Sequence, residues 1–240
     1  MNNTRVQAVL RKEFRDYRRN RFVIITMVIS PLVFVFWSLI LILPLPASTP
    51  SSQLNTSVGI SMLFNLLIPA TMPIVVAAYA VVGEREQGTL EPMLTTPVLN
   101  QEILIGKALA ALVPAVTISY TIFAIVLAVV GVFAEPNVAL AVFQVPLILA
   151  LALFAPLTAG WSILVGIATS VRSRDVRTAQ QIAALASLPL IAIISLMGFG
   201  VIPKTTPVAL GIAAALLLID SLGWRVVSAM FKRERLVTGS

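Results

Sequence analysis

Six long apolar segments constrain the fold of this chain more than any other feature. A helix needs about 20 mostly apolar residues to cross the roughly 30 Å hydrocarbon core of a bilayer. Backbone groups in lipid must be hydrogen-bonded internally, and the alternation of a membrane β-strand is missing, so each segment is predicted to be a helix. The predicted spans are 22–43, 58–82, 103–130, 146–169, 179–200 and 207–227. The sequence thus predicts an all-α membrane protein with one transmembrane domain, 22–231, and a short cytoplasmic tail, 232–240.

The composition narrows the possible functions. Of the 240 residues, 58% are hydrophobic and 11% charged, and the chain contains neither cysteine nor histidine. Thiol nucleophiles, imidazole bases and zinc sites built from these residues are therefore excluded, and we expect no catalytic residue and no metal site. The phosphate-binding motif GxxxxGK[ST] is absent too, so ATP hydrolysis by that route is not expected here. Segment 22–43 exceeds the about 7–15 apolar residues of a signal peptide, and we expect it to be retained.

The basic residues predict how the chain is oriented. Of the 17 lysines and arginines, all but Lys204 lie in segments that the six spans place on one side of the membrane. By the positive-inside rule, both termini and the loop after the second span are then cytoplasmic. The net charge of +7 is therefore attributed to the basic residues that set the orientation of the spans. We expect no nucleic-acid partner, since no basic face is interleaved with aromatic residues.

The first 21 residues combine basic residues with an apolar stripe. Val6, Leu10, Phe14 and Tyr17 recur at helical spacing among arginines. An amphipathic basic helix ahead of a span typically lies in the membrane interface with its apolar face toward the lipid. We therefore predict a cytoplasmic elbow helix over 1–21. The simpler alternative is a basic flank of the first span.

A hydrophilic stretch at 81–102, after the second span, holds four of the ten acidic residues: Glu84, Glu86, Glu91 and Glu102. Gly83 or Gly88 is predicted to end the preceding helix. Thr89 is suited to cap a short helix over 90–95 whose apolar face comprises Leu90, Met93 and Leu94. No other cytoplasmic loop is large enough to cover this face, so it is predicted to bind another protein. The alternative is a solvated loop lying on the lipid headgroups.

The run GEREQGTLEPMLTTPVLNQEILIGK, residues 83–107, closely resembles the signature of type-2 ABC transporter permeases. The matching positions are Glu84, Arg85, Glu86, Gly88, Thr89, Leu90, Glu91, Met93, Leu94, Thr96, Pro97, Val98, Gly106 and Lys107. Residues 11–32 are similar to the family's elbow helix and first span, and residues 172–190 to the loop into its fifth span. Pro92 and Met93 depart from the family pattern.

This resemblance implies the membrane half of an exporter. The short helix after the second span would be the coupling helix, seated in a groove of an ATP-binding cassette subunit, with the elbow helix at the same interface. The implied partner-binding residues are Glu84, Arg85, Glu86, Gly88, Thr89, Leu90, Glu91, Met93, Leu94 and Pro97. ATP and Mg²⁺ would be bound by the partner, so no cofactor is expected in this chain. The resemblance also implies a second permease copy or a homologue, in the plasma (inner) membrane.

Two polar residues inside the spans are candidates for a transport pathway. Asp220 is the only acid well inside an apolar span, where a charge costs about 2.5–3.5 kcal/mol. It is expected either to pair with a basic residue such as Arg225 or to contact a substrate or ion. Asn65 is the second candidate, although residues of its kind more often bond helices to one another.

Three other functions stay open at this stage. The chain could be a sodium or haem-linked exporter of the same family, or a scaffold or immunity protein that binds an ATPase without transport. An intramembrane enzyme would need paired polar groups in the membrane, of which the sequence offers only Asp220.

Overall fold

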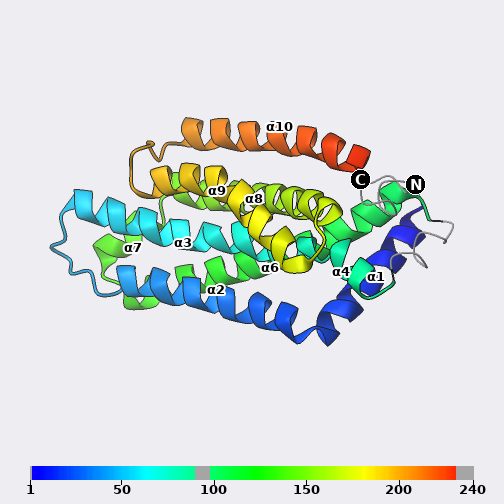
Figure 1. The fold of residues 1–240 in the computed structure, drawn as a ribbon. Coiled ribbons are helices and arrows are strands. Elements are labelled where there is room, and N and C mark those ends of the chain that lie inside the picture. The colour runs from blue at the N-terminus through cyan, green and yellow to red at the C-terminus, as the bar shows by residue number, and fades with distance from the viewer. Residues whose placement is uncertain (1, 90–97, 231–240) are drawn as a thin grey trace.

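The computed structural model describes residues 2–89 and 98–230, which form helices and short connections without a β-strand (Figure 1). The N-terminal half contains α1 (Asn3–Arg19), α2 (Arg21–Ile42), α3 (Ser51–Ala78) and α4 (Val82–Glu86). The remainder contains α6 (Asn100–Phe133), α7 (Pro136–Val142), α8 (Val145–Arg172), α9 (Val176–Gly198) and α10 (Thr206–Met230). The predicted all-helical class is confirmed for the described part of the chain.

Six helices in the described residues are long and apolar enough to cross a membrane, as the sequence predicted. They are α2, α3 with its continuation α4, α6, α8, α9 and α10. Their bounds lie close to the predicted spans except at the start of α3. That helix begins at Ser51 rather than at 58, because the polar residues 51–57 are also helical. Hydropathy marks the part of a helix suited to lipid, and this helix continues beyond that part.

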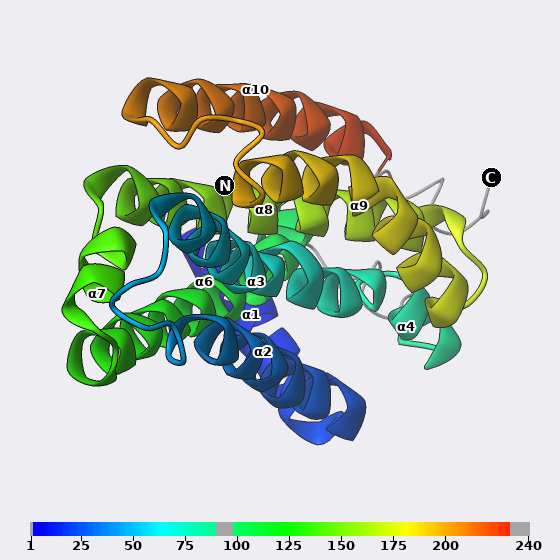
Figure 2. The ribbon, with the colours of Figure 1, turned by 90° about the vertical axis from the view of Figure 1, so that its left-hand side faces the viewer.

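Helix α3 forms the centre of the bundle, and it packs against α2, α6, α8 and α9 (Figure 2). Helix α8 is its most extensive neighbour. Helices α2 and α10 are peripheral, and α10 packs mainly against α8. Their outward faces expose large apolar side chains, such as Phe36 on α2 and Leu218 on α10. Apolar side chains on the outside of a bundle are compatible with lipid contact, since lipid tails are as apolar as leucine.

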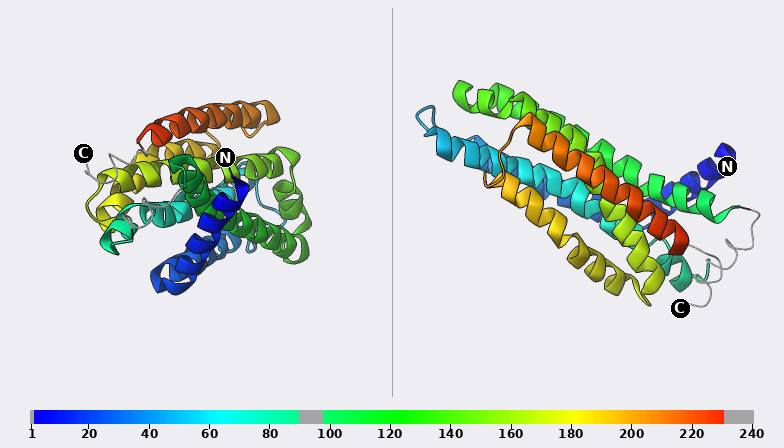
Figure 3. Two further views of the ribbon diagram at one scale, coloured as in Figure 1. Left: turned by 90° about the vertical axis from the view of Figure 1, so that its right-hand side faces the viewer. Right: turned by 90° about the horizontal axis from the view of Figure 1, so that it is seen from above.

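The two ends of the bundle carry different elements. Helices α1 and α4 lie at one end, together with the last described turn of α10 (Figure 1). The α2–α3 loop, α7 and the α9–α10 loop with Lys204 lie at the other. Figure 3 shows α1 turned across the end of the bundle. This arrangement agrees with six spans whose flanking segments share one side, while the orientation in the membrane stays a prediction.

A single residue, Asn20, connects α1 to α2. Asn20 has extended backbone angles, φ −92° and ψ 101°, which end α1. Its side-chain oxygen accepts hydrogen bonds from the backbone N–H groups of Phe22 at 3.1 Å and Val23 at 3.3 Å. Asparagine is among the best N-caps because it satisfies such free donors. The predicted N-terminal helix is therefore present over Asn3–Arg19, and its position at a membrane interface stays a prediction.

Candidate functional site

Helix α1, the predicted elbow helix, packs against the start of α6. Val6 of its apolar stripe is buried, whereas Leu10, Phe14 and Tyr17 are half-buried. Gly106 of α6 permits the close approach, because a Cβ atom at this position would lie 2.6 Å from Val9 Cγ1. Part of the stripe that was expected to face lipid thus faces protein.

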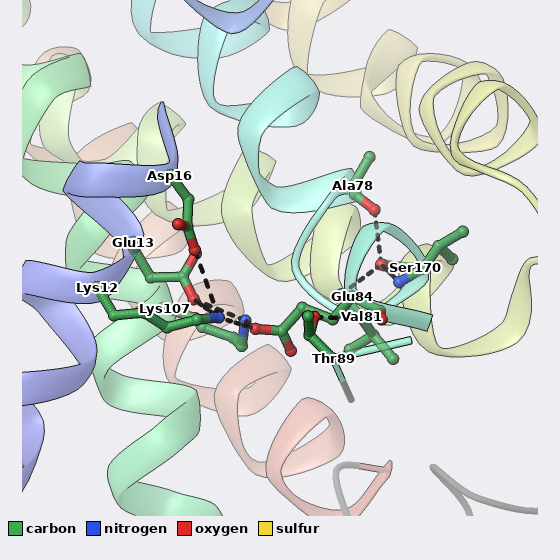
Figure 4. A network of polar contacts seen from close by, with 10 residues as sticks. Lys12, Glu13, Asp16, Ala78, Val81, Glu84, Thr89, Lys107 and Ser170 are labelled. Carbon is green, nitrogen blue, oxygen red and sulfur yellow. Dashed lines mark hydrogen bonds and ion pairs between the residues drawn. The ribbon is translucent and has the colours of Figure 1, made fainter. Parts of the chain in front are cut away.

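A cluster of four charged side chains joins α1, α4 and α6 at this end of the bundle (Figure 4). Lys107 of α6 places its Nζ atom 2.8 Å from Glu13 Oε1 of α1 and 2.8 Å from Glu84 Oε1 of α4. Lys12 of α1 pairs with Glu84 as well, and its Nζ lies 3.4 Å from Glu13 Oε1. The Lys107 side chain is only 2% exposed, whereas that of Lys12 is 41% exposed. We call these residues the four-charge cluster.

The charges in this cluster stabilise one another's ionised forms. Burial alone would raise the pKa of Glu13, but Lys107 and then Lys12 hold it below its ordinary value of 4.5. Burial alone would lower the pKa of Lys12, but Glu13 and Glu84 raise it above its ordinary range. The two ammonium groups and two carboxylates of the cluster balance in charge, which is the condition under which buried charges are tolerated. The exposed Asp16 adds a further carboxylate, whose Oδ2 lies 3.6 Å from Lys12 Nζ.

A further carboxylate, that of Glu102, connects the N-terminus of α1 to the N-terminus of α6. Glu102 is almost fully buried, and its Oε1 accepts a hydrogen bond of 2.7 Å from the backbone N–H of Asn2. Its Oε2 accepts one of 3.1 Å from the N–H of Leu99, the residue that precedes α6. Arg5 Nη1 lies 3.7 Å from the same oxygen. A glutamate in the first helical turn that reaches back to the N-cap N–H is a common helix-start arrangement.

The break between α3 and α4 is satisfied by a hydroxyl group from another helix. Ser170 of α8 donates to the carbonyl of Ala78 at 2.7 Å and accepts from the N–H groups of Val81 and Val82 at 3.0 and 3.1 Å (Figure 4). Interrupted helices in membranes require such partners for the freed backbone groups. The chain can therefore turn into α4 without leaving these groups unpaired.

Gly88 ends α4, as one of the two predicted breaking positions. Its φ of +68° lies in the left-handed region that favours glycine. The Gly88 N–H donates to the Arg85 carbonyl at 3.1 Å, and the Thr89 N–H donates to the Glu84 carbonyl at 2.9 Å. These two bonds are those of a Schellman motif. The alternative position, Gly83, lies inside α4 and faces the Tyr79 ring, so it does not end the helix.

The two residues after Glu84 connect α4 to the loop between α8 and α9. Arg85 donates to the carbonyl of Ser173 at 3.2 Å. Glu86 accepts from the N–H of Val176 at 3.3 Å, in the first turn of α9. Each member of the Glu-Arg-Glu run thus has its own contact: Glu84 with α1 and α6, Arg85 with the loop, and Glu86 with α9.

The predicted partner-binding residues do not form one exposed surface in the described part of the chain. Glu84 was expected on a partner surface, but its side chain faces inward and is nearly buried, because Lys12 and Lys107 surround it. Arg85 is half-buried and Glu86 exposed, and both contact this chain. Gly88 and Thr89 are exposed. Five further predicted residues lie outside the described residues: Leu90, Glu91, Met93, Leu94 and Pro97.

The predicted site residues do not include Lys12, Glu13 or Ser170. Their contacts join positions 72 to 94 residues apart, which no local pattern reveals. One signal was available. Lys107 is a charged residue inside an apolar segment, where a carboxylate partner is expected.

Asn65 bonds two helices together. Its side-chain N–H group donates to Ser38 Oγ of α2 at 3.0 Å and to the Ser61 carbonyl of α3 at 3.0 Å. Ser38 and Ser61 also share a hydrogen bond. Asn65 is buried at this contact, so its position favours the helix-bonding role over a place on a pathway.

Asp220 makes no ion pair with a described residue, so the suggested pairing with Arg225 is not observed. Its Oδ1 atom is buried and has no hydrogen-bond partner among the described residues. Its Oδ2 atom lies 2.8 Å from the point that a Cβ atom on Gly160 would occupy. The carboxylate thus rests against α8 at a position where a side chain is missing.

The fold and this site define a class: a six-helix membrane protein whose N-terminal helix is anchored to the segment after its second span. Residues 7–224 match the family described as ABC-2 family transporter protein. The chain therefore belongs to this family and is a membrane component of a transporter. Such permeases are channel subunits that are not themselves catalytic, and they generally work with ATP-binding cassette subunits. No curated protein matches the sequence significantly.

Proposed function

We propose that this chain is the permease subunit of an ATP-driven exporter in the plasma (inner) membrane, with both termini in the cytoplasm. ATP and Mg²⁺ bind to separate cassette subunits, which dock on the coupling helix expected at 90–95. A second permease copy or a homologue completes the pathway. Hydrolysis takes place on the partner, and this chain converts the partner's movement into a movement of its spans.

One observation carries this proposal: both flanks of the expected docking segment are anchored to the elbow helix. On the N-terminal side, α4 contributes Glu84 to the four-charge cluster with α1 and α6. On the C-terminal side, Glu102 links the start of α6 to the N-terminus of α1. A displacement of the docking segment therefore reaches α1, α4 and α6 together.

These contacts also suggest where the movement goes. Helix α4 continues from α3 at the centre of the bundle, and α6 packs against α3 and α8. A partner that pulls or pushes the docking segment thus acts on the central helix and on a neighbouring span. Buried ion pairs suit such a joint, because each depends strongly on its partner's position.

There are two alternatives to this proposal, one a narrower kind of exporter and the other not a transporter. A sodium exporter would need several oxygen ligands around the ion, and Asp220 is a single carboxylate. A scaffold or immunity protein would bind an ATPase through the same docking segment but would transport nothing. Substrate-dependent stimulation of the partner's ATP hydrolysis separates transport from scaffolding.

The test is a mild-detergent purification of the tagged chain from its native host, with mass spectrometry of the proteins that accompany it. We expect a P-loop subunit near one-to-one stoichiometry that is lost in Leu90→Asp or Leu94→Asp. The matched control is Val201→Asp, an exposed aliphatic residue at the opposite end of the bundle, which should leave the partner bound. A folded chain that purifies alone, without ATPase activity at any salt concentration, contradicts the proposal.

A further inference from the structure

A groove with one carboxylate lies between α6, α8 and α10. Its volume is about 260 Å³. Eight of its nine lining residues form a mostly apolar wall around Asp220: Ile105, Ala108, Leu109 and Leu112 of α6, Gly160, Ile163 and Leu164 of α8, and Trp224 of α10. We call this space the Asp220 groove.

Helical spacing explains why these residues meet. The α6 residues 105, 108, 109 and 112 form one helical stripe, and the α8 residues 160, 163 and 164 form another. On α10, Asp220 and Trp224 are four residues apart and therefore share a face. Because α6 and α10 both pack against α8, α8 forms the floor between them.

The groove leaves a carboxyl group without a partner. Asp220 is the only charged residue that lines it, and the buried Oδ1 atom accepts no hydrogen bond from the described residues. Asp220 lies ten residues, about 15 Å, from the last described residue of α10, so it is well inside the span. An isolated carboxylate in apolar surroundings is strongly stabilised by a cation that enters them.

The lining residues select the kind of cation. Inorganic ions need several oxygen ligands to replace their water, and no cluster of three acidic side chains occurs in the described chain. A cation with an apolar body instead contacts the aliphatic walls of the groove. Trp224 adds an aromatic side chain to the lining, and aromatic rings attract organic ammonium groups.

We propose that the Asp220 groove binds organic cations, such as ammonium compounds with an aromatic or alkyl body, through the Asp220 carboxylate and the Trp224 ring. This inference rests on the proposed function, since it names the substrate class of the transporter. The α6 turn that carries Lys107 of the four-charge cluster also carries Ile105 and Ala108 of the groove wall. A movement imposed on the cluster is thereby passed directly to the ligand site.

The test measures binding to the purified full-length chain in lipid nanodiscs, without a partner or ATP. The probe is radiolabelled 4-phenylbutyl-trimethylammonium, compared with its neutral isostere, in which a tert-butyl group replaces trimethylammonium. Asp220→Asn keeps the side-chain shape and removes the charge, so partitioning into lipid cancels between variant and native chain. Glu135→Gln, at an exposed carboxylate that precedes α7, is the matched control.

We expect Asp220→Asn to weaken binding of the cation about tenfold or more, with Asp220→Glu retaining most of it and Glu135→Gln unchanged. Binding of the neutral isostere should not depend on Asp220. Quenching of Trp224 fluorescence, in a chain with Trp37 and Trp161 replaced by phenylalanine, should follow the same order. Equal affinity of the cation for native chain and Asp220→Asn overturns the inference. A change in oligomeric state in Asp220→Asn overturns it too, because the carboxylate then serves assembly.

The result is independent of the ATPase partner. Cation binding without a co-purifying P-loop subunit would leave the binding site standing and remove the exporter proposal, together with the role of this site in transport. A co-purifying P-loop subunit without Asp220-dependent binding of the cation would support the exporter proposal and overturn this inference.

Discussion

Replacing Lys107 with methionine tests whether the four-charge cluster holds the elbow helix in place. Lys107 Nζ lies 2.8 Å from a carboxylate oxygen of Glu13 and 2.8 Å from one of Glu84, and its side chain is 2% exposed. Removing one member of a buried ion pair costs about 3–5 kcal/mol, because the remaining charge is left uncompensated. Lys12 still contacts both carboxylates, so we expect the lower end, about 3 kcal/mol.

Amide hydrogen exchange reports this loss locally. At about 1.4 kcal/mol per factor of ten, exchange in α1 should accelerate by up to about a hundredfold in Lys107→Met, while the centre of α3 changes little. Lys12→Met is the matched control and should have a much smaller effect, since that side chain is 41% exposed and its pairs are screened by water. Adding Glu13→Gln and Glu84→Gln to Lys107→Met should restore part of the protection. Unchanged exchange in α1, or equal effects of the two lysine variants, would refute this reasoning.

Three further predictions concern the same end of the bundle. Gly106→Leu should detach α1, because even a Cβ atom at this position would lie 2.6 Å from Val9 Cγ1. Protease cleavage near Asn20 should then accelerate. An unchanged cleavage rate would contradict the packing of α1 against α6. Gly88→Ala should lower stability by about 1–2 kcal/mol, measured by thermal unfolding, because alanine disfavours a φ of +68°. The pKa of Glu13 is lowered, so its stabilisation is complete above pH 4.5 and is lost as the pH falls through the folded-state pKa; Glu13→Gln should flatten this acid-side loss of stability.

Much of the fold could be predicted from the sequence because lipid imposes a simple rule on each span. The six apolar segments correspond to six helices, and the amphipathic stripe from Val6 to Tyr17 lies on a helix. The second span was predicted to start at 58, and α3 begins seven residues earlier, at Ser51, because its first residues are polar and hydropathy does not register them. Because glycines often end helices, the sequence predicted a helix end at Gly83 or at Gly88. In the structure Gly83 packs against Tyr79 inside α4, and α4 ends at Gly88.

The site was harder to predict because its contacts are long-range. The sequence showed an unusual group of carboxylates but not their direction. Glu84 and Glu102 face inward to charges and N–H groups on α1, whereas Glu86 is exposed and contacts the first turn of α9. Lys107 was recognised by its resemblance to a family position, and its pairing with Glu13, 94 residues away, required the three-dimensional structure.

The central claim is that nucleotide on a partner subunit moves α1, α4 and α6 relative to the rest of the bundle. The chain has no cysteine, so spin labels at Arg15→Cys on α1 and Arg225→Cys on α10 would be the only labels on this subunit. We would measure the distance between them by pulsed electron paramagnetic resonance in the complex purified from the native host, diluting labelled with unlabelled permease. The account predicts that Mg²⁺ and ATP shift this distance and that Lys107→Met reduces the shift. An identical distance distribution with ATP, with ADP and without nucleotide would contradict it.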